Sequence, residues 1–304
     1  MMEMTLWGYI WDYCNMASKL LIYLGVAAAI GGPFIAALIS PSVNKKPIIH
    51  YIVINSTLGF IAVIVNFFIR VGAFSETGLS GMFDPDMVNF LWQSTVGDSV
   101  LWRLLAFTLL GFALIFGNLN VRYEKFSLKH AIFIFLYLTA TFSFAYSFTF
   151  VGHSADIGGV AKWLVGFHVV AMAWWIGALY PLWISCKLLQ PPSLCKLMEL
   201  FGKIAMFMVG LLIACGIGLL FLFFANPLEL FSTQYGQAIV LKLIFVVSLL
   251  LIAAYHKYHL VEEVQEEACC HKLQKSIRNE MLIAVIILAI TALLSYALGP
   301  VSLS

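Results

Sequence analysis

Charged side chains are scarce in this sequence. Lys, Arg, Asp and Glu make up 11% of the 304 residues and apolar residues make up 62%, whereas about 25% of the residues in a soluble domain are charged. A water-soluble protein is therefore excluded. The formal net charge of +2 is too small to indicate binding to nucleic acid or to an acidic substrate. The placement of the charges matters more than their sum.

Catalytic motifs are missing as well. The sequence has no P-loop, no dinucleotide-binding glycine motif and no nucleophile elbow in the context that each requires. Three of the six cysteines, Cys186, Cys195 and Cys215, show no metal-ligand spacing such as Cys-x-x-Cys. We therefore expect neither a disulfide framework nor an enzyme.

Long apolar runs take the place of these features. A helix needs about 20 residues to cross the hydrocarbon core of a membrane, so the chain has room for about eight. The runs are continuous rather than alternating, which favours helices over a β-barrel. The sequence predicts an all-α polytopic helix bundle, with residues 1–304 as one transmembrane domain. The expected helices span residues 16–39, 48–74, 98–118, 128–151, 161–186, 201–225, 237–256 and 281–298.

Lysine and arginine collect in every second connection, after the first, third, fifth and seventh helices. Because short loops rich in positive charge stay in the cytoplasm, both termini are expected on the outer, periplasmic side. The first 16 residues have no basic start, so no cleaved signal peptide is expected. The expected spans offer no carboxylate that would suggest a proton-coupled step. The cytoplasmic basic residues are Lys45, Lys46, Arg122, Lys125, Lys129, Lys187, Lys196, Lys203, Lys257, Lys272, Lys275 and Arg278.

Two segments half a chain apart resemble each other. Residues 97–104 and 236–243 both read Gly, five residues, a basic residue and Leu. Many transporters are built from duplicated sets of helices. The match predicts a parallel internal repeat of four helices plus four, with halves at residues 1–151 and 152–304.

Histidine 168 is the most informative polar residue. Of the seven histidines, His153 and His168 lie toward the outer side, and His168 falls well inside the fifth expected helix. An ionisable group at that depth marks a pathway, a cofactor or a proton relay, or else is hydrogen-bonded to a neighbouring helix. The other five lie at cytoplasmic helix ends or loops, where an interfacial position is the simpler interpretation: His50, His130, His256, His259 and His271.

Met172 follows His168 by four residues, so the thioether and the imidazole share one helix face. These two donors together suit Cu(I), whereas Mg²⁺ would require carboxylates. Ordinary helix packing is the alternative for Met172. Trp174 and Trp175, which come next, either wall such a site against water or pack in the core.

The segments around these residues resemble the signature of the copper-resistance D family (CopD, PcoD) of bacterial inner-membrane proteins. The resemblance implies copper movement across the inner membrane, usually as import from periplasm to cytoplasm, and a periplasmic copper-binding partner protein. The segments that carry it are Gly152-His153-Ser154, His168, Ala173-Trp174-Trp175-Ile176-Gly177-Ala178-Leu179, Pro181-Leu182-Trp183, Gly236-Gln237-Ala238 and Leu241-Lys242-Leu243.

The first helix departs from the family, whose members often place a histidine there. The comparable stretch here, residues 12–16, contains none. Either Cys14 or Met16 acts as the soft ligand in its place, or the site is smaller than the family's. The outer copper site therefore has His153, His168 and Met172 as its first candidates, with Cys14 and Met16 as additions.

A second candidate site lies on the cytoplasmic side, where four glutamates lead into Cys269-Cys270-His271. Two adjacent thiols and an imidazole can receive Cu(I) in a reducing compartment. The alternative is a solvated charged helix with incidental cysteines.

A haem b electron-transfer protein is the rival function from another class. A histidine in an apolar helix can ligate haem, and Arg103 and Lys242 could pair with its propionates. Such a protein needs two facing histidines at matching depth, and His168 is the deep one. Snorkelling to the outer headgroups is the simpler role for Arg103 and Lys242.

Overall fold

A computed structural model describes residues 2–75, 77–120, 122, 124–150, 158–224, 226–255 and 267–295. These parts are helical and contain no strand. Eight of their helices are long and apolar enough to cross a membrane, which confirms the predicted fold class. The eight are α1 (Met2–Leu38), α2 (Lys46–Ser75), α4 (Thr95–Phe116), α5 (Leu128–Ser147), α7 (Gly159–Leu188), α8 (Pro191–Phe223), α10 (Gln234–Tyr255) and α11 (Glu267–Leu294).

Three short helices lie at the turns between spans. They are η1 (Gly78–Phe83) and α3 (Pro85–Trp92), between α2 and α4, and α9 (Glu229–Ser232), between α8 and α10. Asp84 caps α3, since its side chain accepts hydrogen bonds from the backbone N–H groups of Asp86 and Met87 at 3.0 Å. These helices continue the chain from one span to the next.

Three helices begin well before their expected starts, and α1, which begins at Met2, is one of them. Helix α8 begins at Pro191, because a proline in the first turn loses no intrahelical hydrogen bond and has a preset helical φ. Helix α11 begins at Glu267, so a charged stretch expected to be a connector is helical. The last candidate span then runs over Cys270–Leu294 and contains Glu280. The expectation that no carboxylate lies within a span is therefore wrong.

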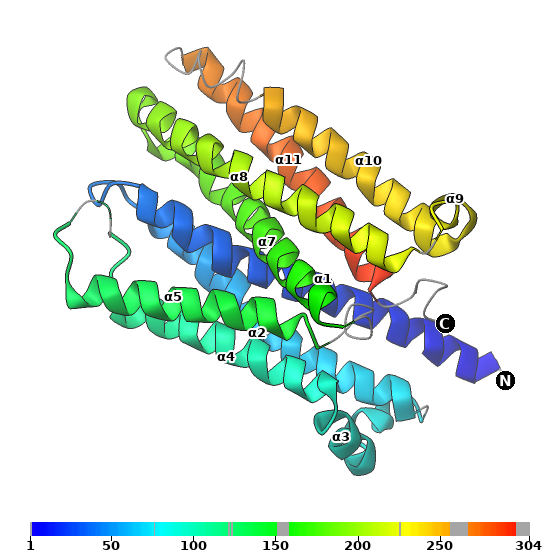
Figure 1. Ribbon diagram of the computed structural model, residues 1–304. Coiled ribbons are helices and arrows are strands. Elements are labelled where there is room, and N and C mark those ends of the chain that lie inside the picture. Colours follow the sequence, from blue (N-terminus) through cyan, green and yellow to red (C-terminus); the bar gives the residue numbers. More distant parts are fainter. Residues whose placement is uncertain are drawn as a thin grey trace.

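Helices α1 and α7 form the centre of the bundle. Figure 1 shows them between a group made of α2, α4 and α5 and a group made of α8, α10 and α11. The chain enters α1 and leaves α11 at one end of the bundle, here called the terminal end. The opposite end, where the α1–α2 connection carries Lys45 and Lys46, is called the basic end. Parallel α1 and α7 run from the terminal to the basic end, and α11 runs back.

The two central helices cross at Gly31 and Gly177. A Cβ atom on Gly177 would overlap the Ala27 carbonyl, and one on Gly31 would overlap the backbone of Trp174 and Gly177. Small residues let membrane helices approach this closely, and the resulting van der Waals contacts hold them together in lipid. This crossing joins the first helix of each predicted repeat half, while the repeat itself stays a prediction.

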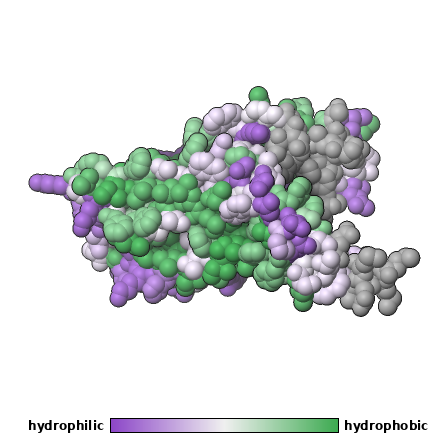
Figure 2. All heavy atoms as spheres, turned by 90° about the horizontal axis from the view of Figure 1, so that it is seen from below, coloured by the Kyte–Doolittle hydropathy of each residue, from purple (hydrophilic) through white to green (hydrophobic). Residues whose placement is uncertain are grey.

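Apolar side chains cover the outside of the bundle. Figure 2 shows a hydrophobic surface across its middle and hydrophilic residues toward the ends. Helices α8 and α10 expose large apolar side chains, among them Phe207, Phe221, Ile244 and Leu251. Because no aqueous surface tolerates a patch of this extent, the band faces lipid.

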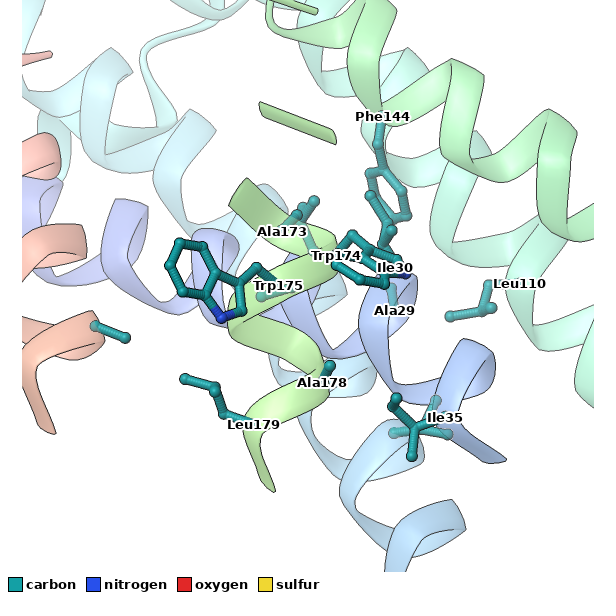
Figure 3. Close-up of a cluster of buried hydrophobic side chains, with 14 of the residues drawn as sticks. Ala29, Ile30, Ile35, Leu110, Phe144, Ala173, Trp174, Trp175, Ala178 and Leu179 are labelled. Atoms are coloured by element: carbon teal, nitrogen blue, oxygen red, sulfur yellow. The ribbon is translucent and has the colours of Figure 1, made fainter. Parts of the chain in front are cut away.

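Trp174 and Trp175 both belong to the packed core. Figure 3 shows them leaving α7 on opposite sides, with Trp174 directed toward Ile30. The Trp174 ring stacks on Phe201 of α8 at 5.0 Å and meets Phe34 of α1 edge-on at 5.2 Å. These contacts hold α7 between its neighbours and fix the direction of the α7 side chains.

Candidate functional site

His168 lies on α7 in the half of the bundle near the terminal end. Its ring packs against α8, where it lies beside Gly216 and the backbone of Leu212. The Nδ1 atom is buried and makes no hydrogen bond to a described residue. The Leu212 backbone is within hydrogen-bonding reach of the ring, and a neutral imidazole with one nitrogen engaged in this way has the other one left for a ligand.

Met172 lies one helical turn further into the bundle on α7. It packs against a small cluster formed by Tyr23 of α1 and by Leu288 and Ala292 of α11. His168 thus faces α8 whereas Met172 faces α1 and α11, and their action as one site stays a prediction. Both are soft enough to bind Cu(I).

Cys14 and Met16 lie nearer the terminal end than His168 does. Because Gly31 and Gly177 cross and the two helices are parallel, His168 is level with residue 22 of α1. Cys14 is eight residues further out, about 12 Å along the helix axis. The structure does not bring Cys14 or Met16 together with His168 and Met172.

The other predicted ligands fall partly outside the described residues. His153 lies outside them, and so does the Cys269 side chain. Cys270 is half-buried near the start of α11, and His271 is exposed. The described residues contain no group of three His, Cys, Asp or Glu side chains that could hold a metal ion. A copper ion at the outer or the cytoplasmic candidate site would therefore be bound by fewer than three such side chains, or partly by methionine sulfur.

Cys186 of α7 is a candidate that sequence analysis missed. Gln274 of α11 donates a hydrogen bond to the Trp183 carbonyl of α7 at 3.4 Å. Since these helices are antiparallel, Cys186 is then level with Cys270, and the two thiols interact electrostatically. Cys186 lies 18 residues after His168, which is five full turns and returns to the same face. That periodicity was visible in the sequence, but the partner on α11 was not.

Sequence analysis also missed a group of basic side chains that lie inside the bundle, in the half near the terminal end. Lys19 of α1 and Arg103 of α4 are each 7% exposed, and both interact electrostatically with Arg70 of α2. Lys19 Nζ donates to the Ser295 carbonyl at 2.7 Å. Arg103 lies 4.6 Å from the centre of the Phe148 ring.

Arg103 therefore points into the bundle rather than snorkelling to the headgroups. The positive charges of Arg70 and Arg103 repel a metal cation from the space between α1, α2 and α4.

The haem alternative needs a second histidine at the depth of His168. In the part of the chain that the structure describes, His130 is buried but lies at the basic end, at the start of α5. His50 and His271 are exposed, also at the basic end. The described helices thus supply one axial ligand at this level, and axial ligation by two histidines has no support from them.

The fold and these side chains define an α-helical polytopic membrane protein whose helix α7 carries an imidazole and a thioether in its terminal half and a thiol near its basic end. Two family profiles match the chain. The one described as "Copper resistance protein D-like, N-terminal domain" matches residues 10–163, and the one described as "Copper resistance protein D" matches residues 195–294. The chain belongs to the copper-resistance D family. No curated protein and no solved structure matches it.

The matched regions confirm the family resemblance and divide the candidate ligands. Cys14, Met16 and His153 fall within the first region, and Cys270 falls within the second. His168, Met172 and Cys186 lie between them, in residues 164–194. The profiles therefore support copper resistance as a property of the family. They do not cover the candidate ligands on α7, which are proposed from the geometry alone.

Proposed function

We propose that this protein carries copper ions across the bacterial inner membrane, from the periplasm to the cytoplasm. Family membership supports copper as the substrate. The arrangement of soft donors along one face of α7 carries the proposal. His168 and Met172 lie near the terminal end, and Cys186 lies near the basic end beside Cys270. The 18 residues from His168 to Cys186 rise about 27 Å, close to the thickness of the hydrocarbon core.

The donor types favour movement toward the basic end. An imidazole and a thioether hold Cu(I) less strongly than thiolates do, and thiols stay reduced in the cytoplasm. Cys269, Cys270 and His271, together with Cys186, form the acceptor for the ion, which cytoplasmic thiols then remove by exchange. His153 is the first ligand that an ion released by a periplasmic copper-binding protein meets. Cys14 and Met16, further out than His168, assist at this step.

The orientation follows from the distribution of basic side chains. Lys45, Lys46, Lys125 and Lys129 lie in or beside the connections at the basic end, so this end faces the cytoplasm. The terminal end, with both chain termini, then faces the periplasm. No enzymatic reaction is assigned to the protein.

Copper binding and uptake in matched variants test this function. Cells that produce the protein should accumulate more copper than cells without it. The His168→Ala variant should bind Cu(I) at least about ten-fold more weakly, since it loses one of few soft donors. The His50→Ala variant, which changes an exposed histidine at the basic end, should bind as the wild type does. Equal affinity in the wild type and the His168→Ala variant would show that His168 is not a copper ligand, which would contradict the outer site.

The acceptor is tested separately from the outer site. A Cys269→Ser, Cys270→Ser double variant should still bind Cu(I) at His168 but deliver less copper to the cytoplasm. A Cys186→Ser variant should show the same pattern if Cys186 contributes a ligand. Unchanged delivery in both variants would show that this segment is only a charged connector.

A further inference from the structure

Glu280 lies inside the membrane-spanning part of α11. Its side chain is 3% exposed, and no other acidic side chain among the described residues is buried. Gln274 of the same helix donates a hydrogen bond to the Trp183 carbonyl of α7, and Glu280 lies six residues, about 9 Å, further along the helix axis toward the terminal end. A carboxylate so deep in a span marks a functional site by default.

The contact between α7 and α11 sets the level of Glu280 relative to the copper ligands. Since Gln274 bonds to the Trp183 carbonyl and the helices are antiparallel, Glu280 is level with Gly177. Met172 is then about 8 Å further toward the terminal end. Glu280 thus lies between the outer pair of donors and the inner thiols.

Met281 adds a soft donor at the same level. It is partly buried against the main core cluster, as Cys270 is. Eleven residues separate Cys270 from Met281, which is close to three full turns, so both face the same side of α11. A thioether on this face stands between Met172 and the thiols of Cys186 and Cys270.

We propose that Glu280 and Met281 form a transient Cu(I) site at the centre of the membrane. The proposal rests on the copper transport proposed above. Met281 Sδ coordinates the ion, and the Glu280 carboxylate supplies the opposite charge. A monovalent cation is strongly disfavoured in the middle of a low-dielectric bundle unless a negative charge lies nearby. Carboxylate oxygen is a poor ligand for a soft ion, so the ion is not trapped and passes on to the thiols.

The proposed Glu280–Met281 site has a different role from the copper sites near the two ends of the bundle. His168 and the thiols bind copper, whereas the central pair lowers the barrier between them. Loss of the Glu280 charge should therefore slow copper movement without weakening copper binding at the outer site. This separation of rate from affinity distinguishes a central site from a purely structural carboxylate.

Uptake by reconstituted vesicles tests the proposal. The purified full-length protein is placed in liposomes that enclose a Cu(I) chelator, and copper is supplied outside as its acetonitrile complex. The Glu280→Gln variant should take up copper at least about ten-fold more slowly than the wild type. The Glu280→Asp variant, which keeps the charge, should recover much of the rate. The Glu199→Gln variant makes the same change at an exposed carboxylate of α8 and should match the wild type.

The Met281→Leu variant provides the second arm, because this nearly volume-conserving change leaves packing largely intact. Its uptake should also fall, and both variants should retain Cu(I) affinity at the outer site within about two-fold. If wild-type vesicles take up no copper, the transport function fails and this site fails with it. If wild-type vesicles take up copper and a folded Glu280→Gln or Met281→Leu variant keeps the full rate, the central site alone is overturned.

Discussion

The side-chain amide of Asn66 on α2 donates a hydrogen bond to the Ser18 hydroxyl on α1 at 2.8 Å, inside the apolar bundle. The same amide donates to Asn15 Oδ1 at 3.2 Å. All three side chains are buried. The bonds join two antiparallel helices near the terminal end and fix the face that α1 turns toward α7, because a buried polar group that loses its partner is costly.

Replacing Asn66 with leucine should destabilise the protein. The Asn66→Leu variant leaves Asn15 Oδ1 and the Ser18 hydroxyl with one partner fewer, at a cost of about 1–2 kcal/mol. Asn55→Leu is the matched control, since Asn55 donates to the Tyr51 carbonyl of its own helix at 2.9 Å. Thermal unfolding in detergent measures both. A larger loss in the control would contradict the role given to Asn66.

Both termini should be accessible from the periplasm. A single cysteine placed at Ser304, in an otherwise cysteine-free protein, should react with a membrane-impermeant maleimide added to intact spheroplasts. A cysteine in place of Lys46, at the basic end, should react only after permeabilisation. The opposite pattern would invert the proposed topology and the direction of transport.

Removing the charge of Lys242 should strengthen copper binding. Lys242 of α10 interacts electrostatically with His168, and a positive charge repels a bound cation. The Lys242→Gln variant should bind Cu(I) about three- to ten-fold more tightly than the wild type, the size of a partly screened charge interaction. The Lys242→Arg variant keeps the charge and should be unchanged. Equilibrium titration against a Cu(I) chelator measures both, and equal affinities in all three proteins would place copper away from His168.

The Lys45 ammonium should make stability depend on pH. It donates to the Ala36 carbonyl at 2.9 Å and to Asn120 Oδ1 at 2.8 Å. Burial lowers the pKa of Lys45 to about 8 from its usual 10.5, and the nearby Glu124 carboxylate opposes this shift. Between these two pKa values the unfolded chain binds more protons than the folded protein, so this group stabilises the fold increasingly as pH rises.

A comparison with the Lys45→Met variant isolates this effect. The stability of the wild type relative to the variant should rise from pH 8 to pH 10 and should be constant below pH 7. Thermal unfolding of both proteins in detergent across this range provides the measurement. A difference that falls with pH would show that Lys45 has an ordinary or raised pKa.

The spans follow from local sequence, because each membrane helix forms its own backbone hydrogen bonds and needs one continuous run of apolar residues. The eight helices were predictable for this reason, whereas the pairing of His168 with Met172, four residues apart on one helix, stays a prediction. The start of α11 was not predictable. Its charged first turns resemble a connector, and only the tertiary structure shows that the helix begins at Glu267 and that Glu280 is buried.

The sequence alone determined an all-helical membrane protein of about eight spans, its resemblance to a copper-resistance family and the soft donors on its fifth span. The tertiary structure alone decided which helices meet. The crossing at Gly31 and Gly177, the level of Cys186 beside Cys270 and the depth of Glu280 depend on contacts between residues far apart in the chain. Lipid gives every apolar face a similar environment, so hydropathy reports that a helix spans the membrane but not which neighbour it packs against.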